Sequence, residues 1–217
     1  MPTTTTTTSP ADDVSDGRPA LRVGIGGPIG SGKTTLVAEL CGRLRERYSV
    51  AVVTNDVNAH EDARLLVRTG SLPEDRVVGL DAGSCPHTTV GDDATQNLAA
   101  VDALIARHAG LDAVFIEGGD DMGSSTFDPE LTDLVIYVID VAAGEKATRR
   151  GVPGITGSDL LVINKSDLAP AVGASLMNME RDAISVRQDR PYVFTNLKAG
   201  DGVDRVADFI IEQGMLE

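Results

Sequence analysis

Short runs of hydrophobic residues recur along the chain, separated by longer segments with helical periodicity. The runs are rich in β-branched residues and mostly lack alternating polar positions, as expected for strands covered on both faces. Seven of them are predicted to form strands: Leu21–Ile25, Val50–Thr54, Val77–Leu80, Ala113–Ile116, Leu134–Ile139, Leu160–Ile163 and Tyr192–Phe194.

Between these runs, apolar residues recur three and four positions apart, which is the spacing of one helical face. Three such sets are Leu36, Val37, Leu40 and Leu44; Leu98, Val101, Ile105 and His108; and Val203, Val206, Ile210 and Ile211. Strands that alternate with helices predict an α/β fold, doubly wound, with a mostly parallel sheet and helices on both faces. Ligands in such folds bind beyond the carboxyl ends of the strands.

The first residues of the chain differ in composition from the rest. A threonine run, Thr3–Thr8, is followed by acidic and proline-containing sequence with few apolar side chains. Such a segment buries too little surface to offset its chain entropy, so residues 1–19 are expected to be a disordered tail. Residues 20–217 keep a globular composition without a second linker, which predicts one domain.

The chain of 217 residues carries 33 acidic and 19 basic side chains, a formal net charge of −14. This balance argues against nucleic acid and anionic membranes as partners, because no basic surplus is present to neutralise phosphates. The two cysteines cannot form a disulfide framework, and no apolar run reaches the roughly 18 residues of a membrane span. The N-terminus also lacks the pattern of a secretory signal, so a cytoplasmic location is expected.

A glycine-rich sequence follows the first predicted strand and precedes the first predicted helix. It satisfies the pattern G-x-x-x-x-G-K-[ST] in the context that P-loop NTPases require. Its glycines let backbone N–H groups turn toward phosphate oxygens, and the helix N-terminus adds a positive dipole end. Lys33 is expected to neutralise the outer phosphates and the Thr34 hydroxyl to ligate Mg²⁺. The residues expected to bind the nucleotide here are Gly27, Pro28, Gly30, Ser31, Gly32, Lys33, Thr34 and Thr35.

A second polar sequence, Asn164-Lys165-Ser166-Asp167, directly follows the predicted strand Leu160–Ile163. The carboxylate can accept hydrogen bonds from guanine N1–H and the exocyclic amine, a donor pair that adenine lacks. Lys165 can lie along the base plane. The pattern N-K-x-D is weak alone, but together with the phosphate loop it favours GTP over ATP. Thr195–Lys198, after the next strand, is a weaker candidate for a further loop on the base side.

Three acidic residues, Asp56, Glu117 and Asp140, lie just after predicted strands, and a fourth, Glu61, comes five residues after Asp56. One or two carboxylates, with a threonine hydroxyl and phosphate oxygens, suit octahedral Mg²⁺. The alternative is a set of solvated carboxylates at strand ends, which we favour for Asp140. The residues expected to act in catalysis are Lys33, Asp56, Glu61 and Glu117, and those expected at the magnesium ion are Thr34, Asp56 and Glu61.

The sequence Cys85-Pro86-His87 lies between a predicted strand and a predicted helix. Pro86 biases Cys85 toward an extended conformation, in which side chains two residues apart point the same way. A thiolate and an imidazole then suit Ni²⁺ or Zn²⁺, and a two-fold dimer would supply four ligands. The alternative is a buried cysteine beside an incidental surface histidine. Cys41, among the leucines of a predicted helix, is expected to be a core residue.

Taken together, these motifs resemble the UreG family of urease accessory GTPases, part of a nickel-chaperone group that also includes HypB. CobW-type metal GTPases are similar but carry a different cysteine-rich element, which this sequence lacks. The resemblance covers about residues 21–200. It rests on the stretches GIGGPIGSGKTTL, AVVTNDVNAHEDARLLVRTG, CPHTTV, FIEGGD, LTDLVIYVIDVA, PGITGSDLLVINKSDLA and FTNLK.

The resemblance implies a slow GTPase that uses GTP and Mg²⁺ and forms a homodimer around nickel through Cys85 and His87. It would work with other urease accessory proteins to deliver nickel to apo-urease. By motif position, Lys33 and Thr34 take the phosphate and magnesium roles, and Asp56 and Glu61 are switch carboxylates. Asn164, Lys165 and Asp167 would recognise the base.

Three segments depart from the usual family pattern: Asp81–Ser84, Glu117–Met122 and the stretch that begins at Ala143. The N-terminal threonines also replace the histidine-rich tail of some members. Other readings therefore stay open. One is a divergent metallochaperone GTPase for another metal enzyme, a second is a nucleotide-dependent small-molecule kinase or synthetase on the same fold, and a third is a regulatory switch.

Overall fold

A computed structural model describes residues 19–55, 59–80, 90–118, 130–142, 151–214 and 216, without the side chains of residues 90–94. The predicted tail, residues 1–19, lies almost entirely outside these residues. All seven predicted strands are present, and each end agrees with its prediction to within one residue. The strands are β1 (Leu21–Gly26), β2 (Val50–Thr54), β3 (Val77–Gly79), β4 (Ala113–Glu117), β5 (Leu134–Asp140), β6 (Leu160–Asn164) and β7 (Tyr192–Phe194).

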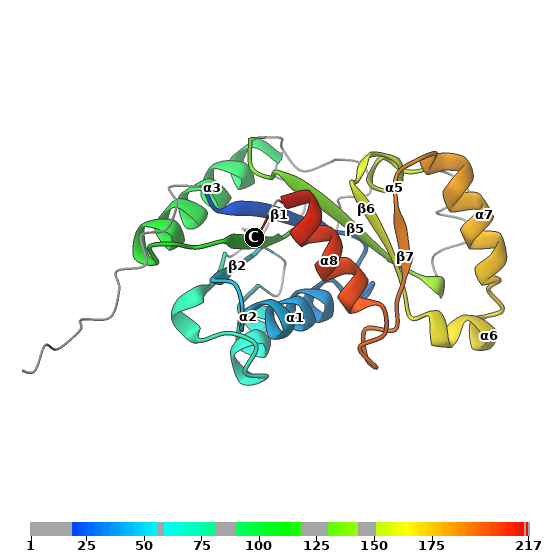
Figure 1. The fold of residues 1–217 in the computed structure, drawn as a ribbon, viewed down its shortest axis with the longest axis horizontal. Helices are drawn as coiled ribbons and strands as arrows, with labels where there is room; N and C mark the ends of the chain where they lie inside the picture. The colour runs from blue at the N-terminus through cyan, green and yellow to red at the C-terminus, as the bar shows by residue number, and fades with distance from the viewer. Residues whose placement is uncertain are drawn as a thin grey trace, which may run out of the picture.

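The described helices alternate with these strands (Figure 1). They are α1 (Lys33–Leu44), α2 (Ala59–Arg68), α3 (Val90–Arg107), α5 (Pro153–Gly157), α6 (Ala169–Val172), α7 (Leu176–Arg187) and α8 (Val203–Gly214), with 3₁₀ turns η1 (Glu74–Arg76) and η2 (Ser166–Leu168). The strands form one sheet in the order β3-β2-β4-β1-β5-β6-β7, and every pair is parallel. The predicted α/β architecture is confirmed.

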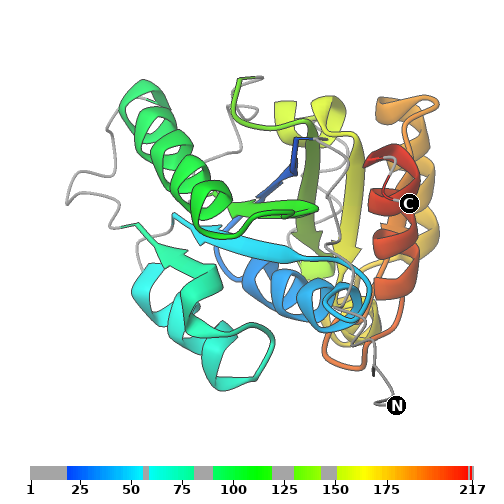
Figure 2. The same ribbon diagram turned by 60° about the vertical axis from the view of Figure 1, so that its left-hand side comes forward.

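Helices cover both faces of the sheet, as Figure 2 shows for α1 and α3 on opposite sides. On one face, α1 and α8 pack on alternate strand residues such as Val23, Val52 and Ile136. On the other face, α3 packs on the β2 and β4 side of the sheet, and α5 and α7 pack on the β5 and β6 side. β2, β4 and β6 are buried along their whole length, which explains their uninterrupted hydrophobic sequences.

Helix α3 differs from its prediction in which face it buries. Ile105, predicted to lie on the core face, is 39% exposed, whereas Leu104 is buried. The buried face consists of Asn97, Ala100, Val101 and Leu104. The prediction selected the larger side chains of the segment. The face that packs on the sheet instead includes one polar and one small residue, Asn97 and Ala100.

The sheet order fixes where a ligand can bind. β1 lies between β4 and β5; the strands that follow β1 along the chain, β2 to β4, lie on one side of it and β5 to β7 lie on the other, so a crevice opens beyond the carboxyl end of β1. The glycine-rich loop begins there, directly after Gly26. Ile25 pairs with Glu117 and Asp140 pairs with Asn164, so polar strand ends from β4, β5 and β6 lie beside this crevice.

Arg187, at the end of α7, is 2% exposed and ties this helix to the amino end of β6. Its guanidinium donates to the Ile155 carbonyl, to the Ser158 hydroxyl at 3.0 Å and to the Pro191 carbonyl at 2.8 Å. Desolvation by burial lowers the pKa of Arg187 to about 10. The side chain therefore stays charged at neutral pH and serves as a buried cross-link.

Replacing Arg187 with Met should lower the free energy of unfolding by at least ~3 kcal/mol, because several buried acceptors lose their donor. Arg190→Met is the matched control. Arg190 also donates to the Ser158 carbonyl and to the Gly157 carbonyl, but its own side chain is exposed, so its loss should cost ~1 kcal/mol or less. Urea unfolding measures both. Equal losses in the two variants would contradict the structural role given to Arg187.

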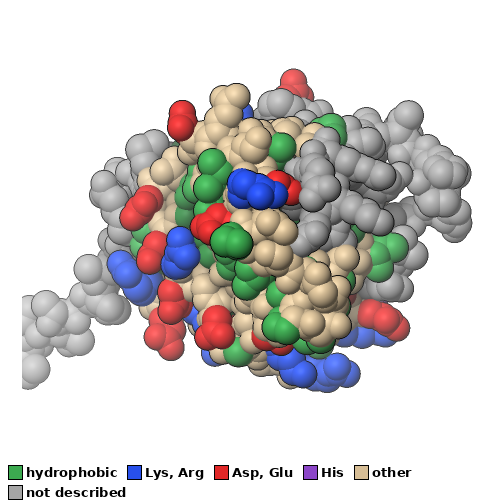
Figure 3. Space-filling model, turned by 90° about the vertical axis from the view of Figure 1, so that its right-hand side faces the viewer, with side chains coloured by type: hydrophobic (Ala, Val, Ile, Leu, Met, Phe, Trp, Pro, Cys, Tyr) green, Lys and Arg blue, Asp and Glu red, His purple; other side chains and the backbone are tan. Residues whose placement is uncertain are grey.

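The surface of the described residues mixes both charge signs. On the face at the α6–α7 end, acidic and basic side chains are interspersed with small hydrophobic groups (Figure 3). The exposed hydrophobic residues at this end are Leu168, Val172, Met177 and Ile184. Within the described part of the chain, no helix has the length and apolar character to span a membrane.

Candidate nucleotide-binding site

The glycine-rich loop wraps the start of α1. Gly30 and Gly32 have φ angles of 72° and 107°, a region that side chains other than glycine rarely adopt. Gly32 is the N-cap of α1, which has no capping side chain and no acidic residue in its first turn. Because the N–H groups of a first helical turn have no partners within the helix, this end of α1 can bind an anionic ligand.

Lys33 lies at the first position of α1 and is 4% exposed. Its Nζ donates to the carbonyl oxygens of Gly27 at 3.0 Å and Pro28 at 3.3 Å. The amine is therefore held against the inner side of the loop. The arrangement gathers one fixed positive charge and a helix N-terminus at the same place, which suits phosphate groups.

Thr34 is placed between two carboxylates. Its hydroxyl donates to Glu117 Oε1 at 2.7 Å and lies 3.3 Å from Asp62 Oδ1. Glu117 ends β4 and is fully buried, whereas Asp62 comes from α2. One hydroxyl and two carboxylates are the hard oxygen donors that Mg²⁺ takes together with phosphate oxygens, so the residues present fit that ion.

Glu61 does not share this position. It is exposed on α2 and does not line the cavity, whereas its neighbour Asp62 does. The helical spacing explains the difference, because Asp62 is three and four residues from the buried Ala59 and Leu66 and so shares their face. That spacing was the available signal for Asp62. Asp56, the other predicted switch carboxylate, lies outside the described residues.

Asp62→Asn should reduce the magnesium-dependent nucleotide hydrolysis that the sequence predicts by ~10-fold or more, because one carboxylate charge beside Thr34 is removed. Glu61→Gln is the matched control on the same helix and should change the rate by ~2-fold or less, as an exposed substitution. Phosphate release against Mg²⁺ concentration measures both variants. A larger loss in Glu61→Gln than in Asp62→Asn would reverse this assignment.

Asn164, the last residue of β6, is buried and joins three segments. Its Nδ2 donates to the Ser31 carbonyl at 2.9 Å, and its Oδ1 accepts from Thr195 Oγ1 and Leu197 N, both at 3.2 Å. Its amide is thereby engaged with the phosphate loop and with the loop after β7. The structure supports a positioning role for Asn164 between these loops.

Lys165 and Asp167 continue from Asn164 toward the solvent. Lys165 has a left-handed backbone, φ 58°, and its Nζ donates to the Gly30 carbonyl at 2.6 Å and pairs with Asp140 at 2.9 Å. Asp167 is exposed and lines the cavity, as Asn196 and Lys198 do. The structure thus brings the segment Thr195–Lys198 next to the N-K-x-D turn.

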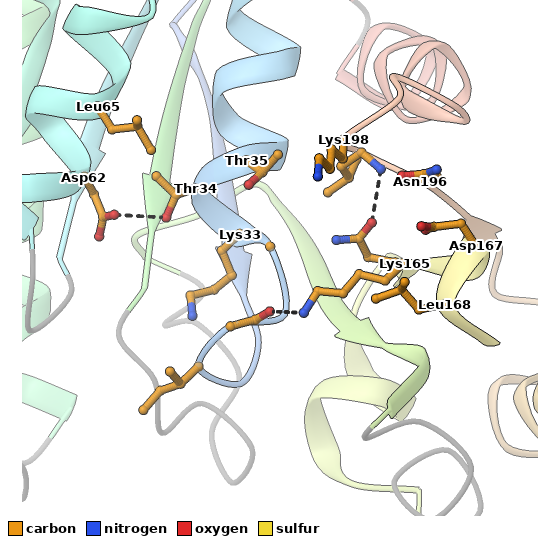
Figure 4. Close-up of a pocket in the computed structure, with 15 residues that line it drawn as sticks. Lys33, Thr34, Thr35, Asp62, Leu65, Lys165, Asp167, Leu168, Asn196 and Lys198 are labelled. Atoms are coloured by element: carbon orange, nitrogen blue, oxygen red, sulfur yellow. Dashed lines mark hydrogen bonds between the residues drawn. The ribbon is translucent and has the colours of Figure 1, made fainter. Parts of the chain in front are cut away.

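These parts enclose a cavity of ≈ 540 Å³. Figure 4 shows Thr34, Asp62 and Leu65 on one side of the start of α1, and Lys165, Asp167, Asn196 and Lys198 on the other. Side chains suited to phosphate and side chains suited to a base therefore face one cavity from its two ends. The size and polarity of the cavity fit a mononucleotide. The lining residues are Ile29, Gly30, Gly32, Lys33, Thr34, Thr35, Asp62, Leu65, Asn164, Lys165, Asp167, Leu168, Asn196, Leu197 and Lys198.

Of the cysteine and histidine candidates, Cys85 and His87 lie outside the described residues. Cys41 is fully buried in the core, as predicted, and desolvation raises its thiol pKa to about 12. Among the residues that the structure describes, no three His, Cys, Asp or Glu side chains gather in a way that could hold a metal ion. The carboxylate pair at Thr34 would therefore need phosphate oxygens to complete a magnesium shell.

Comparison with known proteins gives the same architecture. The chain aligns with the hydrogenase maturation factor HypB from Archaeoglobus fulgidus at a TM-score of 0.73 and 24% identity, covering 91% of each chain. HypB from Helicobacter pylori, solved in complex with nickel, aligns at 0.74 and 19%, covering 90% of this chain and 87% of that one. A LAO/AO transport system kinase aligns at 0.59 and 21%, covering 90% of this chain but 59% of that chain.

These three likenesses establish the fold alone, since all are below 25% identity. The family follows from a sequence model, the nucleotide-binding domain of CobW/HypB/UreG proteins, which matches residues 21–194. That span contains the phosphate loop, the carboxylates at Thr34 and the N-K-x-D turn. The chain belongs to the CobW/HypB/UreG family of nucleotide-binding proteins.

Proposed function

We propose that this protein is a GTPase that uses its nucleotide state to control metal delivery. The observation that carries the nucleotide part is the single cavity that Lys33 and Thr34 share with Asp167. A triphosphate at the start of α1 would place its base beside the N-K-x-D turn. The Asp167 carboxylate matches the N1–H and amine donors of guanine, which supports GTP over ATP.

Each residue at the phosphate end has a defined task in hydrolysis. Lys33 and the N–H groups of α1 would stabilise negative charge on the transferred phosphoryl group. Thr34 and Asp62 would hold Mg²⁺, which when bound neutralises phosphate charge, with Asp56 a further candidate. Glu117 is buried at the end of β4 and accepts from Thr34, so it would add a second carboxylate beside the ion and would also orient the attacking water. Turnover by the isolated chain is expected to be slow.

The metal part of the proposal rests on Cys85-Pro86-His87 and on the UreG-like motifs around it. Two copies of the chain would each contribute one thiolate and one imidazole as ligands of a shared nickel ion, which the dimer would carry to its client. Nickel is the favoured ion because a relative of this fold, HypB from Helicobacter pylori, was solved in complex with nickel; Zn²⁺ would suit a tetrahedral version of the same ligands. The proposed client is apo-urease, reached in the cytoplasm with other urease accessory proteins.

Size-exclusion chromatography with light scattering, with and without a GTP analogue and Ni²⁺, tests this proposal. Wild type should become dimeric only when both are present, and Cys85→Ala should stay monomeric. Cys41→Ala is the matched control, since this thiol is buried in the core and should not affect assembly. Dimerisation of Cys85→Ala, or dimerisation of wild type that does not depend on the GTP analogue, would refute the proposed nucleotide-controlled metal delivery.

Two further measurements distinguish this proposal from the alternative functions. Dimerisation with Zn²⁺ but not Ni²⁺ would favour a metallochaperone for another metal enzyme. Transfer of the γ-phosphate to a small molecule, instead of release as inorganic phosphate, would favour a kinase or synthetase on this fold.

A further inference from the structure

An ion pair lies at the boundary between the phosphate loop and the base-recognition turn. Lys165 Nζ is 2.9 Å from Asp140 Oδ2 and also donates to the Gly30 carbonyl oxygen at 2.6 Å. Asp140 ends β5, Lys165 follows the end of β6, and Gly30 belongs to the phosphate loop. One ammonium group thus connects three segments that are distant in the sequence.

The Asp140 carboxylate has a fixed orientation. Its side chain is 13% exposed, and its Oδ1 accepts a hydrogen bond from the Ala142 backbone N–H at 2.9 Å. Asp140 is also paired in register with Asn164, the residue before Lys165. The sheet and the local hydrogen bond therefore hold the carboxylate in place, with Oδ2 facing Lys165.

An ionic partner restricts the position of the Lys165 side chain. Its side chain is 37% exposed and has four rotatable bonds, so its amine would otherwise sample many positions. Its backbone is in the left-handed region, φ 58° and ψ 36°, which a non-glycine residue adopts only where the surroundings enforce it. Lys165 also lines the cavity together with Gly30, so the position of this side chain shapes the site.

We infer that Asp140 is a positioning residue for nucleotide binding that acts through Lys165. The carboxylate holds the ammonium group against Gly30, so that the base-recognition turn and the phosphate loop keep the spacing that one nucleotide must bridge. This inference rests on the proposed function, since the nucleotide is taken to be a guanine nucleotide. Asp140 was the carboxylate that the sequence favoured least, and its ion pair with Lys165 is the observation that changes this.

The geometry predicts how the loss of Asp140 should appear. Asp140→Asn keeps an oxygen for the Ala142 N–H but removes the charge that faces Lys165. GDP and GTP both bridge the two loops whose spacing the ion pair holds, so the substitution should weaken both to the same degree, by ~5- to 20-fold, and leave kcat unchanged. Lys165→Met should weaken binding at least as much. Asp140→Asn in the Lys165→Met background should then add ~2-fold or less.

The test is a titration of the full chain with a fluorescent GDP analogue, together with thermal unfolding and GTP turnover. Asp133→Asn is the matched control. Asp133 lies directly before the first residue of β5, whereas Asp140 is the last, and it pairs with Arg22 at 3.1 Å, away from the cavity. It should bind GDP like wild type. If Asp140→Asn does not fold, Asp140→Ser replaces it, since a serine hydroxyl can also accept from the Ala142 N–H.

The outcomes separate this inference from the proposed function. Wild type that binds no guanine nucleotide would refute the proposed function itself. Wild type that binds GDP, with Asp140→Asn binding equally well, would overturn the inference alone. A loss that adds fully to that of Lys165→Met, or a fall in kcat without a change in KM, would also overturn it, because Asp140 would then not act through Lys165.

Discussion

Replacing Asp167 with Asn is expected to change the base preference of the protein from guanine to xanthine. Asp167 is exposed into the cavity beside Asn196 and Lys198. Its two carboxylate oxygens can accept from N1–H and the exocyclic amine of guanine. An asparagine amide would point an N–H donor at the exocyclic amine, which is itself a donor. Xanthine carries a carbonyl oxygen in place of this amine, and that oxygen can accept the hydrogen bond from the asparagine.

The expected loss for guanine is large because a charge-assisted hydrogen bond is replaced by two opposed donors. About 3–4 kcal/mol is expected, which corresponds to ~100- to 1,000-fold in Kd. Titration with GDP and XDP measures the exchange, and Asp189→Asn, an exposed carboxylate outside the cavity, is the control. An Asp167→Asn variant that still prefers GDP would show that the base is not bound at this turn.

Gly27→Ala should have the second large effect, on folding of the phosphate loop. The φ angle of Gly27 is 148°, and a Cβ built there would lie 2.1 Å from the Val138 backbone oxygen. Val138 belongs to the buried β5 strand, so this oxygen cannot move aside. We expect at least ~3 kcal/mol of destabilisation and a loss of nucleotide binding of more than ~100-fold.

Gly30→Ala is the control that separates backbone strain from the steric clash. Gly30 also has a positive φ, 72°, but a Cβ there would have no atom within 4 Å. It should therefore cost only the ~1 kcal/mol of a left-handed backbone. Chemical unfolding and GDP titration measure both variants. If Gly30→Ala were as damaging as Gly27→Ala, the close approach to Val138 would not explain the requirement for glycine.

The sheet could be predicted from sequence because its strands are buried on both faces. A run such as Leu160–Ile163 contains no polar residue, so its ends are clear in the sequence and lie within one residue of the observed strand ends. Helix orientation was harder to predict. In α3 the face that packs on the sheet contains Asn97 and Ala100, and hydrophobicity alone selected Ile105 instead.

The two nucleotide motifs were predictable because each is continuous in sequence. Contacts between distant segments were not. The pairing of Thr34 with Asp62 depends on how α2 is rotated, and the ion pair of Asp140 with Lys165 depends on β5 and β6 being neighbours. The role of Asn164 as a link between two loops likewise follows from the sheet order and not from the motif.

The roles given to the other residues depend on one cavity binding a guanine nucleotide between Lys33 and Asp167. Calorimetric titration of the wild-type chain with GDP and with ADP, in the presence of Mg²⁺, tests it most directly. We predict that GDP binds at least ~100-fold more tightly, because adenine lacks the donors that Asp167 accepts. Equal affinity for the two nucleotides, or tighter binding of ADP, would contradict this account of the site.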